Sequence, residues 1–556
     1  MTGMRSAMPL GPRDNWTIRN IAQRRLAESA GRQFVAEVNG AAESYGTFIG
    51  RAASLSRFLL EQGVDIGDTV AVFCPNGIPA LHGWMAASLI GAVDVTINAD
   101  YRGDLLRHVL TVARPAVVLA DSALLPQMAE IAAELPFLRH VVVVGGDGLT
   151  ARPSFPGVDF HVYADIVAMP DAALPERVVK PSDVASVMFT SGTTGPSKGV
   201  MMPNAQVCVL AHQAIVNTRF TEDDVYYCVH PLNHIAGKFM GVLASFAVGA
   251  RLVLDKRFDA ERWLGVIRDN AITLSIAHGP MIEMIHATPQ TPFDRDHALH
   301  RLMCCPLPKT IGHAFERRFG LRGIEMWGMT EVACPCWTPY EGDRPLGSCG
   351  KPMDDWYDVK IVDPETDGEL DQGAVGEIVV RPRYPWTMMS QYMGMPQETL
   401  AAWRNLWFHT GDAAWRDADG NIFIVDRIKE RIRRRAENIS SFDIEVAVLD
   451  YPGVREAAAV GVPSGMEGDD DIKLCIGTAE TLEPAAILAY LAARLPHFMV
   501  PRYIEIMPSL PRTPTNKLRK RELRDAGIGE ATWDRQKAGI RLRELISEAR
   551  ASKAEA

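Results

Sequence analysis

The sequence lacks a long uninterrupted run of hydrophobic residues. The longest run extends from Phe239 to Ala250 and ends at Arg251, whereas a helix that spans a bilayer needs about 20 apolar residues. The opening residues, MTGMRSAMPLGPRDNW, also lack the apolar core of a secretory signal peptide. We therefore expect a soluble chain with neither a signal peptide nor an integral membrane segment.

Cysteine is scarce, and its spacing is irregular. The chain has nine cysteines, an odd number without a framework pattern, which is typical of reduced thiols in a cytoplasmic protein. Two close groups, Cys304-Cys305 and Cys334-Pro335-Cys336, lack the second pair or the histidines of a zinc site. The sequence therefore predicts a cytoplasmic protein without a structural metal.

The chain has no excess of positive charge. Its 58 Lys and Arg residues against 68 Asp and Glu residues give a formal net charge of −10, which argues against a nucleic-acid partner or an anionic membrane surface. A hydrophobic content of 47% with 23% charged residues is ordinary globular usage, and it excludes wholesale disorder, collagen and coiled coils. The length allows several compact units, and a homodimer is compatible with the sequence.

Strand-like and helix-like segments alternate along most of the chain. The strand-like runs lie at 69–74, 116–120, 140–144 and 273–277, and the helix-like segments lie at 50–62, 77–91, 122–134 and 259–270. This alternation predicts an α/β fold with parallel-rich sheets covered by helices. From about residue 340, Gly- and Asp-punctuated strands with the turn DADGN at 417–421 predict a small antiparallel, barrel-like part.

A change of composition at Asp426 predicts a domain boundary. Six basic residues lie within the ten that follow it. Beyond this point, helix-like segments at 441–450 and 484–495 alternate with strands near 457–462, 472–477 and 502–507. We therefore predict a large N-terminal domain at 1–425, a hinge at 426–429 and a small mobile α+β domain at 430–556, whose last segment is a frayed helix.

The stretch TSGTTGPSKG at 190–199 carries the strongest chemical signal. It follows the apolar run from Val184 to Phe189 and combines three glycines with hydroxyl side chains and a lysine. Glycines let backbone N–H groups turn toward an oxyanion, so the stretch predicts a polyphosphate cradle for ATP. It departs from the Walker pattern because Gly199 follows the lysine. The residues predicted to hold ATP here are Thr190, Ser191, Gly192, Thr193, Thr194, Gly195 and Lys198.

Two other interpretations of this stretch differ in class. Residues 195–199 also match G-x-S-x-G, the nucleophile elbow of serine hydrolases. An elbow serine sits directly at a strand-to-helix turn, whereas here the strand-like run ends about seven residues before Ser197. A non-catalytic nucleotide-binding sensor is the second alternative.

TSGTTGPSKG resembles the signature loop of the adenylate-forming enzymes, the superfamily of acyl-CoA synthetases, peptide-synthetase adenylation domains and luciferases. Further motifs of that superfamily follow in the same order, as far as residue 520. NADYRGDLLRHVL at 98–110 and RRRAENIS at 433–440 are similar to the carnitine- and crotonobetaine-type CoA ligases.

The resemblance implies a role for residues in four further motifs. In MWGMTE at 326–331, Trp327 offers a flat face to adenine, Thr330 donates to a phosphate, and Glu331 binds magnesium. Asp412 of FHTGD suits the two ribose hydroxyls. The hinge places Arg427 near the ribose and makes Lys429 the pivot. Lys517 of LPRTPTNKLRK at 510–520 resembles the catalytic lysine.

The resemblance also implies where the acyl group and coenzyme A bind. The implied acyl and CoA tunnel residues are His234, His278, Gly279, Cys305 and Ala436. Ala436 stands where the family has glycine. Its methyl group either narrows the path of the pantetheine arm or is accommodated by shifts of neighbouring residues. Asn233 stands where an aromatic residue is common, and Asn516 replaces the glycine before Lys517. The arginines at 431, 433, 434 and 435 meet CoA phosphates or form a solvated run.

These motifs predict a magnesium-dependent acid:CoA ligase. A non-polar carboxylic acid reacts with ATP to give acyl-AMP and pyrophosphate, and coenzyme A then displaces AMP. The mostly apolar pocket segments favour a non-polar acyl group. An enzyme that loads a carrier-protein thiol is the nearest alternative, while the serine hydrolase and the nucleotide sensor are the alternatives of another class.

Overall fold

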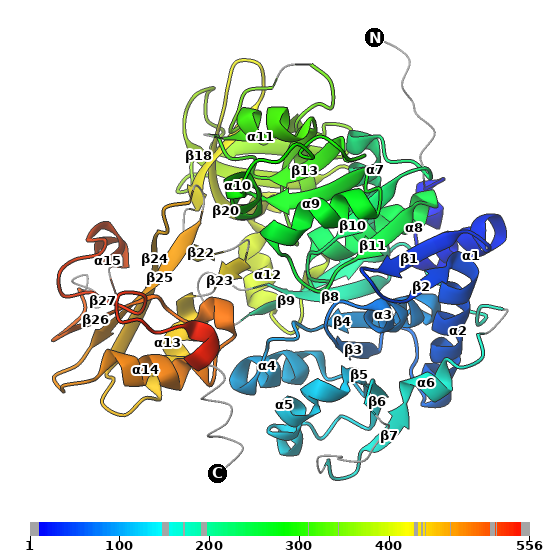
Figure 1. Ribbon diagram of the computed structural model, residues 1–556, viewed down its shortest axis with the longest axis horizontal. Helices are drawn as coiled ribbons and strands as arrows, with labels where there is room; N and C mark the ends of the chain where they lie inside the picture. Colours follow the sequence, from blue (N-terminus) through cyan, green and yellow to red (C-terminus); the bar gives the residue numbers. More distant parts are fainter. Residues whose placement is uncertain are drawn as a thin grey trace.

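The computed structural model of the protein describes residues 10–146, 155–170, 173–190, 197–309, 311–342, 344–427, 432–434, 437–439, 441–466, 469–511, 518 and 520–545. Two large sheets carry most of the chain, a four-stranded antiparallel sheet adjoins them, and a C-terminal lobe follows (Figure 1). We use the name C-terminal lobe for the described residues from 432 to 545. The predicted fold class is confirmed.

One large sheet has eight strands in the order β19-β9-β8-β4-β3-β5-β6-β7. Strands β8, β4, β3, β5, β6 and β7 run parallel to one another, whereas β9 is antiparallel to β8 and β19 is antiparallel to β9. The valine-rich central strands are buried on both faces, as parallel strands under helices must be. The bounds are β3 Thr69–Phe73, β4 Val93–Thr96, β5 Val117–Asp121, β6 His140–Val144, β7 Asp159–Val162, β8 Val184–Thr190, β9 Lys198–Pro203 and β19 Gln391–Tyr392.

The other large sheet has nine strands in the order β16-β15-β14-β13-β12-β10-β11-β1-β2. Its strands from β14 to β1 are parallel, and the two edges are antiparallel. The bounds are β1 Gln33–Glu37, β2 Ala42–Ser44, β10 Val225–Cys228, β11 Arg251–Leu254, β12 Leu274–His278, β13 Arg301–Cys305, β14 Arg322–Met329, β15 Ala333–Trp337 and β16 Lys351–Pro352.

Helices cover both large sheets. Around the nine-stranded sheet, α9 Ala260–Asp269, α10 Gly279–Ala287 and α11 Gly312–Phe319 share one hydrophobic cluster, and Figure 1 shows them gathered on one face. The other main helices are α1 Ile18–Ser29, α2 Tyr45–Glu61, α3 Ile78–Ile90, α4 Gly103–Ala113 and α7 Asn204–Thr218. Of the helices predicted in this region, the one at 122–134 is wrong, because short turns η2 Ser122–Leu124, α5 Leu125–Ala129 and η3 Ala132–Glu134 replace it. Pro126 lacks the N–H that an α-helix would need at this point.

The longest hydrophobic run of the sequence lies in the interior. It forms a π-helix, Ala236–Leu243, followed by α8, Ala244–Val248, and every described residue of the π-helix is buried. The π-helix contacts α7 and strands β10 and β12. Among the described helices, none combines the length and apolar character that a membrane crossing requires.

A buried ion pair joins this π-helix to the eight-stranded sheet. Nζ of Lys238 lies 2.5 Å from Oδ2 of Asp94 on β4, and both side chains are almost completely buried. Asp94 also accepts hydrogen bonds from Ser186 (2.8 Å) and Thr96 (2.9 Å). Burial lowers the pKa of Lys238, and the Asp94 carboxylate opposes that shift. The ion pair is therefore a fixed link between helix and sheet.

The antiparallel part forms a separate four-stranded sheet in the order β17-β18-β20-β21. Its strands are β17 Tyr357–Val362, β18 Gly376–Pro382, β20 Phe408–Arg416 and β21 Ile422–Arg427. In the predicted turn, Oδ1 of Asp417 accepts the backbone N–H groups of Asp419 (3.0 Å) and Asn421 (2.8 Å). The antiparallel arrangement and this turn confirm the prediction.

The C-terminal lobe has its own sheet and hydrophobic clusters. Strands β24, β25, β26 and β27 are covered by α13 and α14, and Figure 1 shows the lobe in orange and red beside the rest. The bounds are α13 Ser441–Leu449, β24 Glu456–Pro463, β25 Asp470–Gly477, α14 Pro484–Ala492, β26 Tyr503–Met507, α15 Lys520–Asp525 and β27 Trp533–Asp534; two short strands, β22 Ile432–Arg434 and β23 Glu437–Ile439, precede them. The predicted frayed helix at the end of the chain lies outside the described residues.

Arg434 and His497 of the C-terminal lobe make polar contacts that fix their surroundings. Arg434 is buried and donates to the carbonyls of Phe498 (3.1 Å) and Val500 (2.7 Å), so its interpretation as a CoA contact or a solvated charge is wrong. His497 lies 3.4 Å from Asp100, which follows β4 in the large part of the molecule. The hydrogen bond to His497 is the main reason why the pKa of Asp100 is lowered.

We predict that Lys238→Met lowers the free energy of unfolding by about 3–5 kcal/mol, because it leaves the Asp94 carboxylate buried without its cation. Urea-induced unfolding measures the change. The double variant Asp94→Val/Lys238→Met should recover most of the loss, since it removes both charges. The exposed Lys351→Met is the control and should change stability by less than about 0.5 kcal/mol. A Lys238→Met protein as stable as the wild type would contradict the prediction.

Candidate active site

The predicted phosphate cradle joins two antiparallel strands. Thr190 at the end of β8 pairs with Lys198 at the start of β9. Oγ of buried Ser197 donates to the carbonyl of Thr190 (3.0 Å), and Nε2 of His108 donates to the carbonyl of Ser197 (2.7 Å). Ser197 thus precedes a strand that is antiparallel to β8, whereas a nucleophile elbow leads from a strand into a helix. The serine hydroxyl is held by the backbone, which disfavours the hydrolase alternative.

The residues predicted for adenine and ribose meet across two sheets. Trp327 lies near the end of β14 in the nine-stranded sheet, and Asp412 lies on β20 in the antiparallel sheet. Nε1 of Trp327 donates to Oδ2 of Asp412 at 2.9 Å, and both residues are buried. Arg427 on β21 occupies the register position opposite Asp412. The indole edge therefore orients the carboxylate.

The segment with Thr330 and Glu331 is held from α7. Nε2 of Gln206 donates to the carbonyls of Thr330 (2.8 Å) and Glu331 (3.2 Å). The backbone N–H of Met389 also donates to the Glu331 carbonyl (2.9 Å). The turn after β14 is therefore fixed by backbone contacts, which leaves both side chains for other partners.

Tyr392 connects Glu331 with Lys198. Its hydroxyl donates to Oε1 of Glu331 (2.9 Å), and Nζ of Lys198 lies 4.6 Å from the centre of its ring. The short strand β19 brings Tyr392 beside β9, where it pairs with Val200. The sequence reasoning missed Tyr392 because a two-residue strand has no periodicity. Tyr392 therefore contacts both Glu331, the predicted magnesium ligand, and Lys198, a predicted phosphate ligand.

Glu331 suits magnesium that binds together with a nucleotide. Within the described residues, no group of three or more His, Cys, Asp or Glu side chains could hold a metal ion by itself. Magnesium at a nucleotide needs only one or two protein carboxylates, because phosphates and water supply the other oxygens. A single buried carboxylate, which Tyr392 links to a lysine, fits this arrangement.

The predicted acyl-pocket residues gather at the carboxyl ends of neighbouring parallel strands. His278 ends β12, Cys305 ends β13, and Nδ1 of His278 donates to the Cys305 carbonyl (3.1 Å). The ring of His234 lies 6.4 Å from that of His278. Gly279 starts α10, where an added Cβ would lie 3.6 Å from Pro306. The structure therefore brings these four residues together.

The remaining predicted site residues are not covered by the structure. The residues outside the described ranges are Ser191, Gly192, Thr193, Thr194, Gly195, Lys429, Ala436 and Lys517. Their roles stay predictions.

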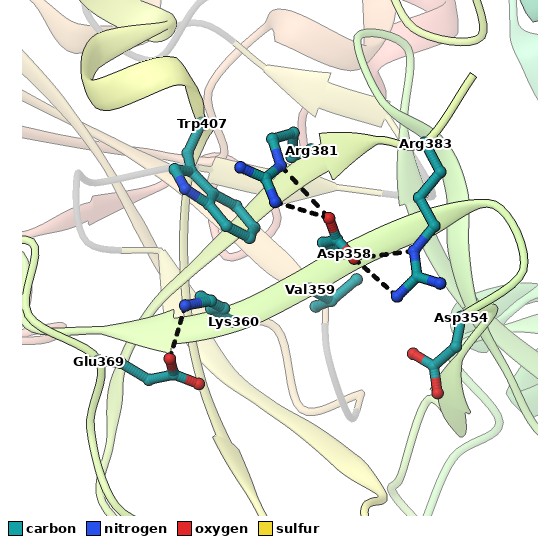
Figure 2. Close-up of a pocket in the computed structure, with 8 residues that line it drawn as sticks. All are labelled: Asp354, Asp358, Val359, Lys360, Glu369, Arg381, Arg383 and Trp407. Carbon is teal, nitrogen blue, oxygen red and sulfur yellow. Dashed lines mark hydrogen bonds and ion pairs between the residues drawn. The ribbon is translucent and has the colours of Figure 1, made fainter.

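A charged surface pocket of 390 Å³ lies elsewhere, on the antiparallel sheet (Figure 2). Figure 2 shows Arg381 and Arg383 turned toward Asp358, at 2.9 and 2.7 Å, and Lys360 toward Glu369 at 2.7 Å. Its basic side chains are thus paired with acidic ones. The pocket contains none of the residues that the sequence predicts for ATP or the acyl group.

Comparisons with known proteins decide the family. Residues 22–393 match the family model of the AMP-binding enzyme, and residues 443–517 match that of the AMP-binding enzyme C-terminal domain. This chain belongs to the AMP-binding enzyme family. The predicted resemblance to adenylate-forming enzymes is confirmed.

Individual relatives agree with this assignment. A crotonobetaine/carnitine–CoA ligase of Salmonella arizonae is 29% identical over 483 residues, which cover 86% of this chain and 91% of the relative. ATP-bound MatB from Rhodopseudomonas palustris is 25% identical with a TM-score of 0.68, over 92% of this chain and 99% of MatB. The o-succinylbenzoate CoA synthetase MenE of Bacillus subtilis, at 22% identity and a TM-score of 0.78 over 92% of this chain and 98% of MenE, shows the same fold.

We predict that Tyr392→Phe weakens magnesium-dependent ATP binding about tenfold, because Glu331 loses the hydroxyl that orients it. Titration calorimetry with ATP, in the presence and absence of magnesium, measures the effect. Tyr340→Phe, whose ring lies under Arg219 away from these residues, is the matched control. Equal magnesium dependence in Tyr392→Phe and the wild type would show that the hydroxyl has no such role.

Proposed function

We propose that this protein is an ATP-dependent acid:CoA ligase that forms an acyl-AMP intermediate. The proposal rests on one observation above all: a member of the AMP-binding enzyme family brings Trp327 against Asp412, and Tyr392 against both Glu331 and Lys198. These are the side chains that adenylate formation needs around adenine, ribose and phosphates. The names of its relatives support coenzyme A as the acceptor.

In the first half-reaction, protein side chains hold ATP for attack. Trp327 provides the flat face for adenine, and the Asp412 carboxylate accepts from the ribose hydroxyls. Lys198 and the 190–198 loop hold the β- and γ-phosphates with N–H donors and one positive charge. Thr330 donates to a phosphate oxygen. Magnesium bound at Glu331 would screen the negative charge of the phosphates.

The substrate carboxylate then attacks the α-phosphorus of ATP. A new bond forms between carboxylate oxygen and phosphorus, while the bond to the bridging oxygen of the β-phosphate breaks and pyrophosphate leaves. Lys517 stabilises the negative charge that develops around the α-phosphate, a preorganised electrostatic contribution. The loop at 190–198 holds the leaving pyrophosphate.

In the second half-reaction, the thiol of coenzyme A attacks the acyl carbon. The carbon–sulfur bond forms, the thiol loses its proton to solvent, and AMP leaves with the former carboxylate oxygen. AMP is a far better leaving group than the oxide of a free carboxylate. Neither step requires a covalent enzyme intermediate, in agreement with the backbone-bound hydroxyl of Ser197.

The two half-reactions use different positions of the C-terminal part. We propose an adenylation domain at 1–425, a hinge at 426–429 with Lys429 as pivot, and a mobile domain at 430–556. The C-terminal lobe has hydrophobic clusters of its own, against one of which Tyr101 and Leu105 of the large part pack, and a lobe with its own core can move as one unit. Arg427 at the hinge lies opposite Asp412 in the β20–β21 pair, so the hinge begins beside the proposed ribose site.

The function is tested by pyrophosphate release across a panel of carboxylic acids, each with magnesium and ATP, with and without coenzyme A. We expect pyrophosphate with at least one acid, and AMP and an acyl-CoA when coenzyme A is added. A carrier-protein thiol offered in place of coenzyme A separates the two acceptors. ATP binding without pyrophosphate release for any acid would favour the nucleotide sensor and reject the ligase.

We predict that Lys517→Ala slows adenylation by about 10²- to 10³-fold, or roughly 3–4 kcal/mol of transition-state stabilisation. The reason is the loss of one preorganised charge at the α-phosphate. Single-turnover formation of acyl-AMP measures the rate, with exposed Lys537→Ala as the control. ATP affinity should change much less than the rate, and an unchanged adenylation rate would remove Lys517 from this role.

A further inference from the structure

The nine-stranded sheet contains a point at which the chain reverses its direction across the sheet. From β10 the chain crosses to β11 on one side, and it later returns to β12 on the other side and continues to β13. In open parallel sheets, ligands bind in the crevice outside the carboxyl ends of the two strands at such a point. Here those ends lead to His230, two residues after β10, and to His278, the last residue of β12.

His230 is a buried polar side chain whose ring nitrogens lack partners. The residue is 4% exposed, and neither Nδ1 nor Nε2 has a hydrogen-bond partner among the residues that the structure describes. A neutral imidazole has one N–H donor and one acceptor nitrogen, and buried groups of this kind are normally satisfied. The ring instead lies edge-on to His278, with 4.6 Å between the ring centres.

Two other buried histidines, His82 and His278, have ring nitrogens with hydrogen-bond partners. His82 is fully buried, and its two nitrogens contact the Tyr163 hydroxyl (2.6 Å) and the Glu43 carboxylate (2.9 Å). His278 donates to the carbonyl of Cys305. His230 therefore differs from histidines that only complete a polar network within the core.

The backbone at His230 is held rigidly. Nδ2 of Asn76 donates to the His230 carbonyl (2.9 Å), and Oδ1 of Asn76 accepts from the N–H of Leu232 (3.1 Å). Gly237 of the π-helix packs so closely that an added Cβ would lie 2.8 Å from the same carbonyl. Because this backbone is fixed, the position from which the His230 ring extends is fixed as well. Binding sites need such support for their side chains.

The charge state of the ring limits what it binds. Burial lowers the pKa of His230 to about 3, and the neighbouring His234 acts in the same direction. The imidazole is therefore neutral at physiological pH. A neutral imidazole can donate a hydrogen bond to an uncharged oxygen or accept one from a hydroxyl. It is less suited to a carboxylate on the acyl group in addition to the one that reacts.

We propose that the acid activated by this protein carries a hydroxyl or ketone oxygen on its acyl group, and that His230 binds this oxygen. The inference rests on the proposed function, and it adds one uncharged polar group to the otherwise non-polar acyl group that the sequence predicts. His230 lies beside His234 and His278, which belong to the proposed acyl pocket. It acts as a residue that determines specificity.

The test uses sets of three acids of equal carbon skeleton: the unsubstituted acid, its hydroxy derivative and its keto derivative, with the oxygen moved along the chain. Pyrophosphate release gives kcat/KM for each. For the wild type we expect the best oxygenated acid to exceed its unsubstituted partner about tenfold or more, because the unsubstituted acid leaves the imidazole unpaired. The hydroxy and keto members show which oxygen is bound.

Variants at His230 separate binding from a structural role. In His230→Leu the ratio between the oxygenated and unsubstituted acids should fall to within about threefold, mainly through a gain for the unsubstituted acid. His230→Gln, which keeps a donor and an acceptor, should keep part of the preference. If His230→Leu does not fold, His230→Phe replaces it. The matched control is His313→Leu, whose side chain is 56% exposed.

The outcomes distinguish this inference from the proposed function. No pyrophosphate release with any acid overturns both. Pyrophosphate release without a preference for an oxygenated acid, or with a preference that His230→Leu leaves unchanged, overturns the role of His230 and leaves the ligase intact. A preference that disappears in His230→Leu and persists in His313→Leu establishes it.

Discussion

The arrangement of the large part depends on the ion pair between Lys238 and Asp94. It connects a π-helix that packs on strands β10 and β12 of the nine-stranded sheet to strand β4 of the eight-stranded sheet. Hydrophobic contacts pack the two sheets together, but they are non-directional. An ion pair with hydrogen-bonded partners has one geometry, so it fixes the position of the helix between the sheets. The π-helix in turn packs against the carbonyls of His230 and Pro231 through Gly237, and this contact positions the proposed acyl pocket.

The candidate site is assembled from segments that are far apart in the sequence. Trp327 and Asp412 belong to different sheets, and Tyr392 lies on an edge strand that pairs with the strand after the phosphate loop. Gln206, on a helix that contacts both large sheets, fixes two consecutive carbonyls with one amide group. The side chains proposed to bind substrate therefore depend on contacts that hold their backbone. Such support is what a site needs if its groups must keep one geometry during catalysis.

Much of the fold follows from local sequence patterns. The valine-rich strands at β3, β5 and β6, the helices α3 and α9, and the antiparallel strands with their turn at Asp417 were all predictable, because hydrophobic periodicity and turn residues act locally. The single helix predicted at 122–134 does not form, because Pro126 interrupts a long amphipathic pattern. The membership of the family was predictable as well, since its motifs occur in order.

Residues that act across long distances could not be found in this way. Asp94 and Lys238 are separated by more than a hundred residues, and each by itself resembles an ordinary charged residue. Tyr392 gains its importance from the strand beside it. His230 stands out only because its nitrogens lack partners in the folded chain. Periodicity and motifs contain no information about such pairings, which arise from the packing of distant elements.

Strand β4 also leads from the buried ion pair to the boundary with the C-terminal lobe. Its interior end is anchored through Asp94, while the chain just beyond it reaches the boundary with the C-terminal lobe, where Asp100 meets the partly exposed His497. This ion pair is half-buried, with the Asp100 side chain 34% exposed, and its loss costs more than that of a fully exposed pair. The proposed rotation of the lobe would separate Asp100 from His497, and Tyr101 and Leu105 from the lobe's hydrophobic cluster, without loosening the strand behind them. In the proposed movement, the large part is the stationary frame against which the lobe changes position.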